Sequence, residues 1–472
     1  MDKEQEDMLN KMFFTEGGIL KGKFEDNADK KAALHKFTLH LIDKYHIKTI
    51  KGTKRREIFI YKDGVYISGE EIIKKDIRDT LEELSTNHLN KEIIEAIKDL
   101  TPIDRDKFTV ETNILNFNNG VFDINTQVFS GHDPKYLFLT KIPVDYVAGL
   151  NCSKIKQFLD AVLDDEQIKI VQEWFGYVLY RSYFIKKAIV CVGDGDTGKT
   201  TLLSLFSSFL GLQNVCGVSL QKISSDKFSV ANLYSKHINI YDELSFKDIN
   251  DNGAFKMVTG GGIITGERKF GDQFQFKNYA KLTFACNKVP DVRDAHDDAY
   301  FNRWIVIQFN YPVEEEDKDK QLIYKMTTPE ELSGLLNFSL EGLTRLLKNE
   351  RFSYDKKPEE IKLEMQCSGS SIADFAFNCL ERSDNDWISK DDMYKAYIDY
   401  TQSKGIPSDT IQTLGRRLRK YANYITDSKP MDSTSGKQIT SWMGVRFKEN
   451  PKPSVAKKEE EKDPFEIFNN IS

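Results

Sequence analysis

The sequence predicts an α/β protein with a nucleotide-binding core and a smaller module at each end. Two observations lead to this prediction. From residue 188 onward, short apolar runs alternate with helical patterns, which is typical of a parallel sheet flanked by helices. One of these runs leads directly into a glycine-rich loop and a leucine-rich helix, the usual context of a phosphate-binding turn. With 472 residues, the chain is long enough for several domains around such a core.

Composition excludes several classes of protein. A hydrophobic share of 40%, with 31 Phe and 20 Tyr, is enough for real cores and excludes global disorder. No apolar run approaches the roughly 18 residues of a membrane span, and the N-terminus is too acidic for a signal peptide. The six cysteines form no CxxC pair, so we expect reduced thiols in an intracellular protein. A net charge of −6 leaves nucleic-acid binding to local basic patches.

The first half of the chain is expected to contain two regions. Residues 1–150 predict an α+β accessory domain, in which helical patterns flank an alternating stretch at 56–69. That stretch predicts a β-hairpin that turns at Asp63 and Gly64. Residues 151–350 predict a helical lead-in followed by the α/β core.

The end of the chain predicts a winged-helix-like module over 366–448 and a disordered acidic tail over 449–472. A connector at 354–365 precedes the module, whose pattern is three helices followed by a strand. The third helix, with Ser408 as its expected N-cap, carries four cations: Arg416, Arg417, Arg419 and Lys420. A basic helix followed by a loop and a strand suits a DNA major groove, so we expect these cations to bind DNA.

Two alternatives for this module stay open. The arginines of the third helix would instead pair with the acidic stretch at 381–392, or the module would dock a protein. Residues 404–446 hold eight Lys or Arg against three Asp or Glu, which favours DNA.

The glycine-rich loop carries the strongest motif. Residues 193–200 match G-x-x-x-x-G-K-[ST] between a predicted strand and a helix. Its glycines let backbone N–H groups wrap phosphates, Lys199 neutralises the β and γ oxygens, and Thr200 ligates Mg²⁺. We therefore expect ATP and Mg²⁺ as cofactors, bound by the whole loop: Gly193, Asp194, Gly195, Asp196, Thr197, Gly198, Lys199, Thr200 and Thr201.

Polar residues follow two further predicted strands. The strand at 237–241 ends in Asp242 and Glu243, where Asp242 would hold Mg²⁺ through water and Glu243 would act as general base on the attacking water. The apolar strand at 282–286 ends in Asn287, whose amide would lie between the γ-phosphate and that water. Hydrolysis needs a second carboxylate and a group that orients water, and these residues supply both.

These three motifs in this order resemble the superfamily 3 helicases of viruses, phages and plasmids. The closer resemblance is to the phage/plasmid and poxvirus-type primase-helicases, and it is strongest over residues 190–310. The resemblance implies an AAA+-like core and a hexameric ring that translocates on single-stranded DNA and unwinds forked duplex in the 3′ to 5′ direction. It also implies a role in replication within a host cytoplasm. About 110 leading residues are too few for a primase domain, so no primase activity is expected of this chain.

The resemblance assigns roles to four more residues. The stretch "GERKFGDQF" matches the family's pore hairpin, which implies that Lys269, with Arg268 and Phe270 beside it, grips single-stranded DNA. Arg303 in "FNRW" matches the arginine that acts across the subunit interface, and Arg293 and Arg268 are weaker rivals. Many relatives carry two consecutive arginines here, whereas this chain has Asn302 before Arg303.

Two other functions remain open. An origin-recognition or loader protein would use ATP as an assembly switch on duplex DNA, without processive unwinding. A small-molecule P-loop kinase would form no ring and leave the residues at 287 and 303 unexplained. The tail at 449–472 places acidic residues before apolar anchors and is a candidate for docking a replication partner.

Overall fold

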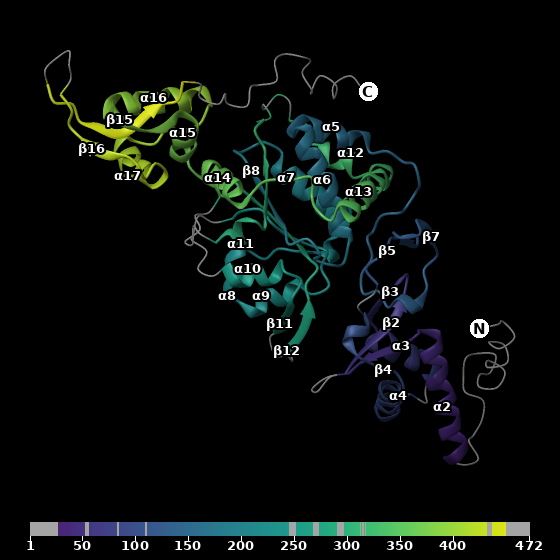
Figure 1. Cartoon of the computed structure of the whole chain (residues 1–472). Helices are drawn as coiled ribbons and strands as arrows, with labels where there is room; N and C mark the ends of the chain where they lie inside the picture. Colours follow the sequence, from purple (N-terminus) through teal and green to yellow (C-terminus); the bar gives the residue numbers. More distant parts are fainter. Residues whose placement is uncertain are drawn as a thin grey trace.

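The computed structural model describes residues 27–51, 56–82, 85–108, 111–244, 252–267, 273–289, 297–311, 313, 316, 318–431 and 437–449. They form an N-terminal unit, a central region around a parallel sheet, and a C-terminal module, which follow one another in Figure 1. The prediction of a mixed α/β protein with a parallel sheet is confirmed. Within these ranges no helix is long and apolar enough to cross a membrane. All six cysteines lie within them as free thiols.

The N-terminal unit is a four-stranded sheet, in the order β3-β2-β1-β4, packed against helices. Strands β2 and β3 form the predicted hairpin, because Asp63 and Gly64 take positive φ values of 50° and 86°, as a type I′ turn requires. The unit comprises α2 (Asn27–Lys44), β1 (Lys48–Ile50), β2 (Glu57–Lys62), β3 (Val65–Ser68), α3 (Glu70–Leu81), α4 (Asn87–Leu100), β4 (Pro102–Ile103) and the 3₁₀ turn η2 (Arg105–Phe108).

A small antiparallel sheet connects this unit to the central region. It contains β5 (Ile114–Asn116), β6 (Val121–Asp123) and β7 (Val128–Ser130), followed by the turn η3 (Pro134–Tyr136). Leu115 and Phe122 of this sheet belong to the central hydrophobic core. Arg181 donates to the backbone oxygens of Glu111 and Ile114, at 3.3 and 2.7 Å. Residues 114–144 therefore contact both regions, because Ile114, Val121 and Phe138 form a separate cluster with Val65 of β3.

The central sheet has five strands in the order β14-β8-β13-β10-β9, all parallel. Its inner strands β8 and β13 are buried along their whole length, as expected for strands covered on both faces. Its strands are β8 (Ala188–Val192), β9 (Val215–Cys216), β10 (Ile238–Tyr241), β13 (Lys281–Cys286) and β14 (Trp304–Gln308).

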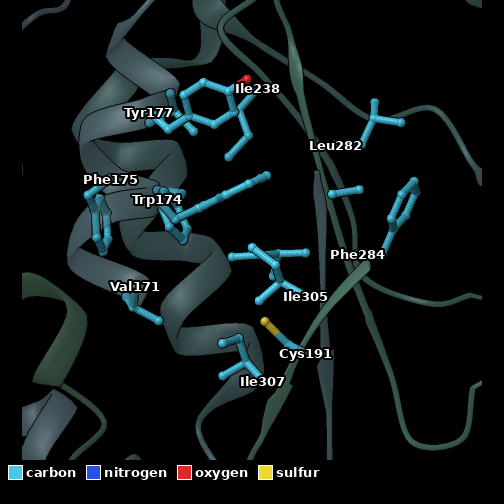
Figure 2. Close-up of a cluster of buried hydrophobic side chains, with 14 of the residues drawn as sticks. Val171, Trp174, Phe175, Tyr177, Cys191, Ile238, Leu282, Phe284, Ile305 and Ile307 are labelled. Atoms are coloured by element: carbon cyan, nitrogen blue, oxygen red, sulfur yellow. The ribbon is translucent and has the colours of Figure 1, made fainter. Parts of the chain in front are cut away.

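Helices cover both faces of the sheet. On one face, Trp174 of α6 donates its indole N–H to Thr283 Oγ1 at 3.0 Å, and Figure 2 shows Cys191, Ile305 and Ile307 pointing toward this helix. On the other face, Trp304 stacks on Phe255 of α10 with ring centroids 4.7 Å apart. The helices on the first face are α5 (Ser153–Val162), α6 (Asp165–Leu179), α7 (Lys199–Leu210) and α13 (Pro329–Asn349).

The remaining elements of the central region are a β-hairpin and several short helices. The hairpin is β11 (Ile263–Glu267) with β12 (Gln273–Lys277), which follows α10 (Asn252–Val258). The short elements are η4 (Leu212–Asn214), α8 (Leu220–Ser225), α9 (Lys227–Val230), η5 (Ala231–Leu233), α11 (Asp298–Phe301) and α12 (Leu322–Met326).

The expected connector at 354–365 is largely helical. Helix α14 (Pro358–Gly369) buries Ile361 and Met365 in the central core, and Tyr354 just before it is also buried there. The prediction of a connector was wrong here because its lysines and glutamates lie on the solvent side of a helix with a narrow apolar stripe.

The C-terminal module has its own hydrophobic core and a three-stranded sheet in the order β15-β17-β16. Its elements are α15 (Ser371–Cys379), β15 (Leu380–Ser389), α16 (Lys390–Ser403), α17 (Ile411–Tyr421), β16 (Thr426–Ser428) and β17 (Ser441–Phe447). The sequence predicted three helices before a strand and missed β15. That strand is mostly polar and exposed, and a β-bulge interrupts its pairing with β17, so it shows no regular alternation.

Candidate active site

The glycine-rich loop begins where β8 ends, at the carboxyl edge of the parallel sheet, where α/β proteins bind ligands. Two of its glycines are required by geometry. A Cβ on Gly193 would lie 2.3 Å from the backbone oxygen of Phe309, and Gly198 has a φ of +92° as the N-cap of α7. Thr200 and Thr201 continue the first turn of α7 after Lys199. The loop therefore leads its backbone directly into a helix N-terminus, which favours an anion.

Lys199 lies inside the loop rather than in solvent. Its Nζ donates to the backbone oxygens of Gly193 and Asp194, at 2.9 and 2.5 Å, and to Thr197 Oγ1 at 3.3 Å. The residue is only 8% exposed, and this burial lowers the pKa of its ammonium group. Phosphate oxygens could replace these neutral carbonyls as acceptors and would pair the charge as well.

The tip of the loop is held by the segment that follows β14. Asp196 takes a positive φ of 58°, and its backbone oxygen accepts a hydrogen bond from the N–H of Val313 at 2.8 Å. Its carboxylate forms an ion pair with Lys318 at 3.2 Å. Asp194, Gly195 and Asp196 are all exposed, so the tip faces solvent on its outer side.

The carboxylates predicted after β10 lie beside the loop. Thr200 Oγ1 donates to Asp242 Oδ2 at 3.3 Å, although β13 separates β8 from β10 in the sheet. Both Asp242 and the adjacent Glu243 are exposed. The structure thus brings together the hydroxyl and the carboxylate that the sequence assigned to one metal ion.

The amide predicted after β13 lies at the same edge. Asn287 directly follows Cys286, and β13 pairs with both β8 and β10. Because parallel strands end at one edge, Asn287 occupies the place between the loop and Asp242. Its side chain is exposed, as an amide that orients water must be.

The residues present fit a nucleotide with Mg²⁺. A hydroxyl and a carboxylate within hydrogen-bonding distance are hard oxygen ligands, and Mg²⁺ is commonly held by one or two such groups together with phosphate oxygens. In the described part of the chain, no group of three His, Cys, Asp or Glu is placed to hold a metal ion. Thr200 and Asp242 would therefore need the nucleotide's own oxygens to complete a magnesium site.

Arg303 lies at the opposite edge of the same sheet. Trp304 pairs with Ala188, and Gln308 pairs with Val192, so Arg303 precedes the amino end of β14 while the loop follows the carboxyl end of β8. Five residues of strand separate the two, or about 16 Å along the strand direction. The arginine is anchored there: Nε donates to Thr259 Oγ1 at 3.0 Å, and Nη1 donates to the backbone oxygen of Ala299.

Lys187 lies next to this arginine and was missed by the sequence analysis. Its Nζ donates to the backbone oxygen and the Oδ1 of Asn302, at 2.5 and 3.3 Å. Burial, with a smaller contribution from the positive charge of Arg303, lowers the pKa of Lys187 to about 8. Asn302 therefore orients a neighbouring cation. Only the register of β8 with β14 brings the two positions together.

Two paired strands stand on either side of the predicted DNA-gripping residues in the sequence. Strands β11 and β12 pair from Ile263–Lys277 to Glu267–Gln273, which gives the antiparallel hairpin implied by the resemblance. Arg268, Lys269 and Phe270 lie outside the described residues, and so does Arg293.

The four cations of α17 are all exposed, but they differ in their partners. Arg419 forms an ion pair with Asp427 and lies over the Trp442 ring, 5.0 Å from its centroid. Lys420 lies 5.5 Å from the Tyr421 ring centroid. Among the described residues, Arg416 and Arg417 make no such contact, which leaves them the most accessible of the four cations.

Two details of this helix differ from expectation. Thr410 is the N-cap, since its side chain accepts a hydrogen bond from the N–H of Thr413, whereas Ser408 bonds to Thr401. Arg419 pairs with Asp427 and not with the acidic stretch at 381–392.

Comparison with known proteins gives two family matches. Residues 5–164 match the family described as D5 N terminal like, and residues 191–303 match a family of unknown function, DUF5906. Each match covers less than half of the chain. None of the curated proteins matches this chain.

Among solved structures, the chain is similar to two of the NrS-1 C-terminal region. The A form apo structure has a TM-score of 0.45 and 14% identity, over 87% of this chain and 99% of that chain. A second apo structure has a TM-score of 0.46 and 16% identity, over 88% of this chain and 98% of that chain. The D5 N terminal like match over the N-terminal region fits a protein of the phage primase-helicase type.

Proposed function

We propose that the protein is an ATP-dependent ring helicase that translocates on single-stranded DNA and unwinds forked duplex during viral, phage or plasmid replication. The observation that carries this proposal is the 3.3 Å contact between Thr200 and Asp242 beside the buried Lys199. It supports a site in which one magnesium ion and the terminal phosphates of ATP share ligands from two strand ends.

Each residue of the site then has a role in hydrolysis. Bound Mg²⁺ supplies charge neutralisation at the β and γ phosphates. Lys199 binds the same oxygens, Glu243 accepts a proton from the attacking water, and Asn287 orients that water. Asp242 and Thr200 would hold the metal ion.

Arg303 completes the site from a neighbouring copy. Its place at the amino edge, about 16 Å along the strands from the loop of its own chain, supports action in trans rather than in cis. A closed ring, with six copies as the expected number, gives every loop such a neighbour. The hydrolysis cycle would move the β11–β12 hairpin, whose loop carries Lys269, along one DNA strand in the 3′ to 5′ direction.

A second function is favoured by the C-terminal module. Exposed Arg416 and Arg417 on α17, beside the β16–β17 wing, fit duplex DNA as well as a fork. An origin-binding or loader protein would use this module with ATP as an assembly switch, without processive unwinding.

The change Lys269→Ala separates the two functions. A helicase should lose unwinding of a forked substrate while it keeps most of its ATP hydrolysis, since the lysine contacts DNA phosphate and not the nucleotide. Lys277→Ala, an exposed lysine at the far end of β12, is the matched control. Unwinding by Lys269→Ala at the wild-type rate would refute the hairpin assignment. ATP-dependent assembly on duplex DNA without any unwinding, by wild type, would favour the loader.

A further inference from the structure

One arginine of the N-terminal unit contacts the β11–β12 hairpin near its loop-side end. The guanidinium carbon of Arg105, in η2, lies 5.9 Å from the ring centroid of Tyr234 and 5.8 Å from that of Phe274 in β12. The two rings meet edge to face, with centroids 5.2 Å apart. Both distances lie within the range in which a cation is attracted by an aromatic ring. Arg105 therefore links the two aromatic residues to another part of the chain.

Arg105 is fixed on its own side as well. Its Nη2 donates to Glu57 Oε1 of β2 at 3.0 Å, and Phe108 in the same turn is buried against Phe59 and Tyr66, at centroid distances of 5.4 and 5.6 Å. Burial alone would lower the pKa of Arg105, but the hydrogen bond to Tyr234 and the Glu57 carboxylate outweigh it and raise that pKa. The guanidinium is thus charged and oriented by both partners.

This part of the hairpin has little space in which to shift. Phe274 lies opposite Gly266 on β11, and a Cβ at Gly266 would lie 3.1 Å from the Cβ of Ala231 in η5. Phe276, two residues along β12, is buried against Tyr234 with centroids 5.5 Å apart. A displacement of β12 relative to Tyr234 would therefore also separate Phe274 from Arg105.

We propose that Arg105 is a positioning residue that couples the N-terminal unit to the hairpin. Through the Phe274–Tyr234 pair it holds the loop-side end of β12 in one position. Any movement of the hairpin then either carries the N-terminal unit with it or breaks this contact. The role in unwinding rests on the proposed function, whereas the contact itself does not.

Hydrogen exchange tests the contact on the full chain. Arg105→Ala should speed amide exchange in β11 and β12 by several-fold, because the loop-side end of β12 loses one of its contacts. Arg56→Ala is the matched control, since Arg56 is similarly exposed, at 35% against 28% of the side chain, and pairs only within its own unit, with Glu95 and Asp99. Equal hairpin exchange in the two variants would overturn the proposal.

The number of base pairs unwound per ATP hydrolysed is a ratio that tests the coupling. Arg105→Ala should lower this ratio by roughly 3- to 10-fold, in the range of coupling effects from residues that touch neither ligand. ATP hydrolysis without DNA and the melting temperature should stay close to those of Arg56→Ala. Arg105→Lys should restore part of the ratio, because an ammonium group still interacts with the two rings.

The outcomes separate this inference from the proposed function. Faster hairpin exchange with an unchanged ratio would mean that Arg105 is only structural, which would overturn the coupling. A chain that hydrolyses ATP but unwinds nothing would refute the helicase, and the exchange comparison would still decide whether Arg105 holds the hairpin. Non-additive exchange rates in Arg105→Ala combined with Phe274→Leu would confirm that the two side chains act through one contact.

Discussion

The two edges of the central sheet carry opposite halves of one chemistry. The carboxyl edge presents backbone N–H groups, Lys199 and the exposed carboxylates of Asp242 and Glu243, which together can bind a nucleotide and a metal ion. The amino edge presents two adjacent cations, Lys187 and Arg303, and no such loop. About 16 Å of strand separates the two edges, so the proposed action of Arg303 on the loop would come from another copy. The difference shows why the proposed site needs a second copy.

The two edges are also built in different ways. The carboxyl edge is shaped by backbone geometry, with Gly193 pressed against Phe309 and Gly198 at a positive φ. The amino edge is shaped by side chains, since Thr259 and Asn302 hold Arg303 and Lys187 in place. Substitutions at the two edges should therefore affect ATP hydrolysis by different mechanisms and to different extents.

The largest expected effect is at the amino edge. Arg303→Ala should lower the rate of ATP hydrolysis by about a thousandfold or more, the value of an arginine that stabilises transition-state charge. Nucleotide binding should remain, because the loop at the carboxyl edge is intact. Steady-state hydrolysis and binding of a fluorescent ATP analogue, measured on the same preparation, check both statements.

An experiment that mixes two inactive variants tests whether Arg303 acts on a neighbouring copy or on its own. Arg303→Ala and Lys199→Ala copies each lack one half of the site, so a mixed ring contains some interfaces with both halves intact. Equimolar mixing should restore measurable hydrolysis that neither variant has alone. If hydrolysis does not recover after subunit exchange is confirmed, then Arg303 does not complete the site of a neighbouring copy.

Lys199→Ala should have the next largest effect. It removes the ammonium group that pairs with the β and γ oxygens, and hydrolysis should fall by about a hundred- to thousandfold. Its melting temperature should not fall, since the buried ammonium is held only by neutral oxygens and its lowered pKa reports a cost of burial. Lys348→Ala, an exposed lysine at the end of α13, serves as control.

Thr259→Val tests how the amino edge is built. Arg303 keeps its guanidinium but loses the acceptor for its Nε, so it should still act, with hydrolysis lower by about tenfold because one orienting hydrogen bond is gone. The same change leaves the loop untouched. A loss as large as that of Arg303→Ala would mean that Thr259 itself contributes to the site.

The carboxyl edge was largely predictable from the sequence, and the amino edge was not. A loop motif and polar residues that directly follow apolar strands lie close in any parallel sheet, so Lys199, Asp242 and Asn287 needed only strand boundaries. Lys187 needed the register of two strands more than a hundred residues apart, which no local pattern records. Its pairing with Asn302 is therefore visible only in the fold.

Other misses have similar physical causes. Strand β15 is polar, bulged and exposed, so it lacks the alternation that identifies strands. Helix α14 has too few apolar residues to be distinguished from a connector, although Ile361 and Met365 are buried. Ser408 and Thr410 are both good N-caps, and only the hydrogen bond to Thr413 decides between them.

The lowered pKa of Lys187 predicts a pH-dependent stability. Its folded pKa of about 8 lies below its ordinary value of 10.5, so between these values the unfolded chain binds more protons and the group's contribution to the free energy of unfolding rises with pH. Lys187→Met should be more stable than wild type at pH 7 by about 1 kcal/mol, after allowance for solvent screening. By pH 9.5 this advantage should shrink. Denaturant titrations at both values measure it, and a constant difference would argue against a buried ammonium.

The smallest expected effects come from substitutions in α17, which lies at neither edge of the central sheet. Arg416→Ala and Arg417→Ala should each weaken duplex binding by a few-fold and reduce the slope of log affinity against log salt by about 1 if the residue contacts a phosphate. Hydrolysis without DNA should not change. Arg419→Ala should instead lower the melting temperature of the module, since Arg419 bridges Asp427 and Trp442. If all three changes weaken DNA binding equally and leave stability intact, then the Asp427 contact is not what holds Arg419, and α17 binds DNA with its whole basic face.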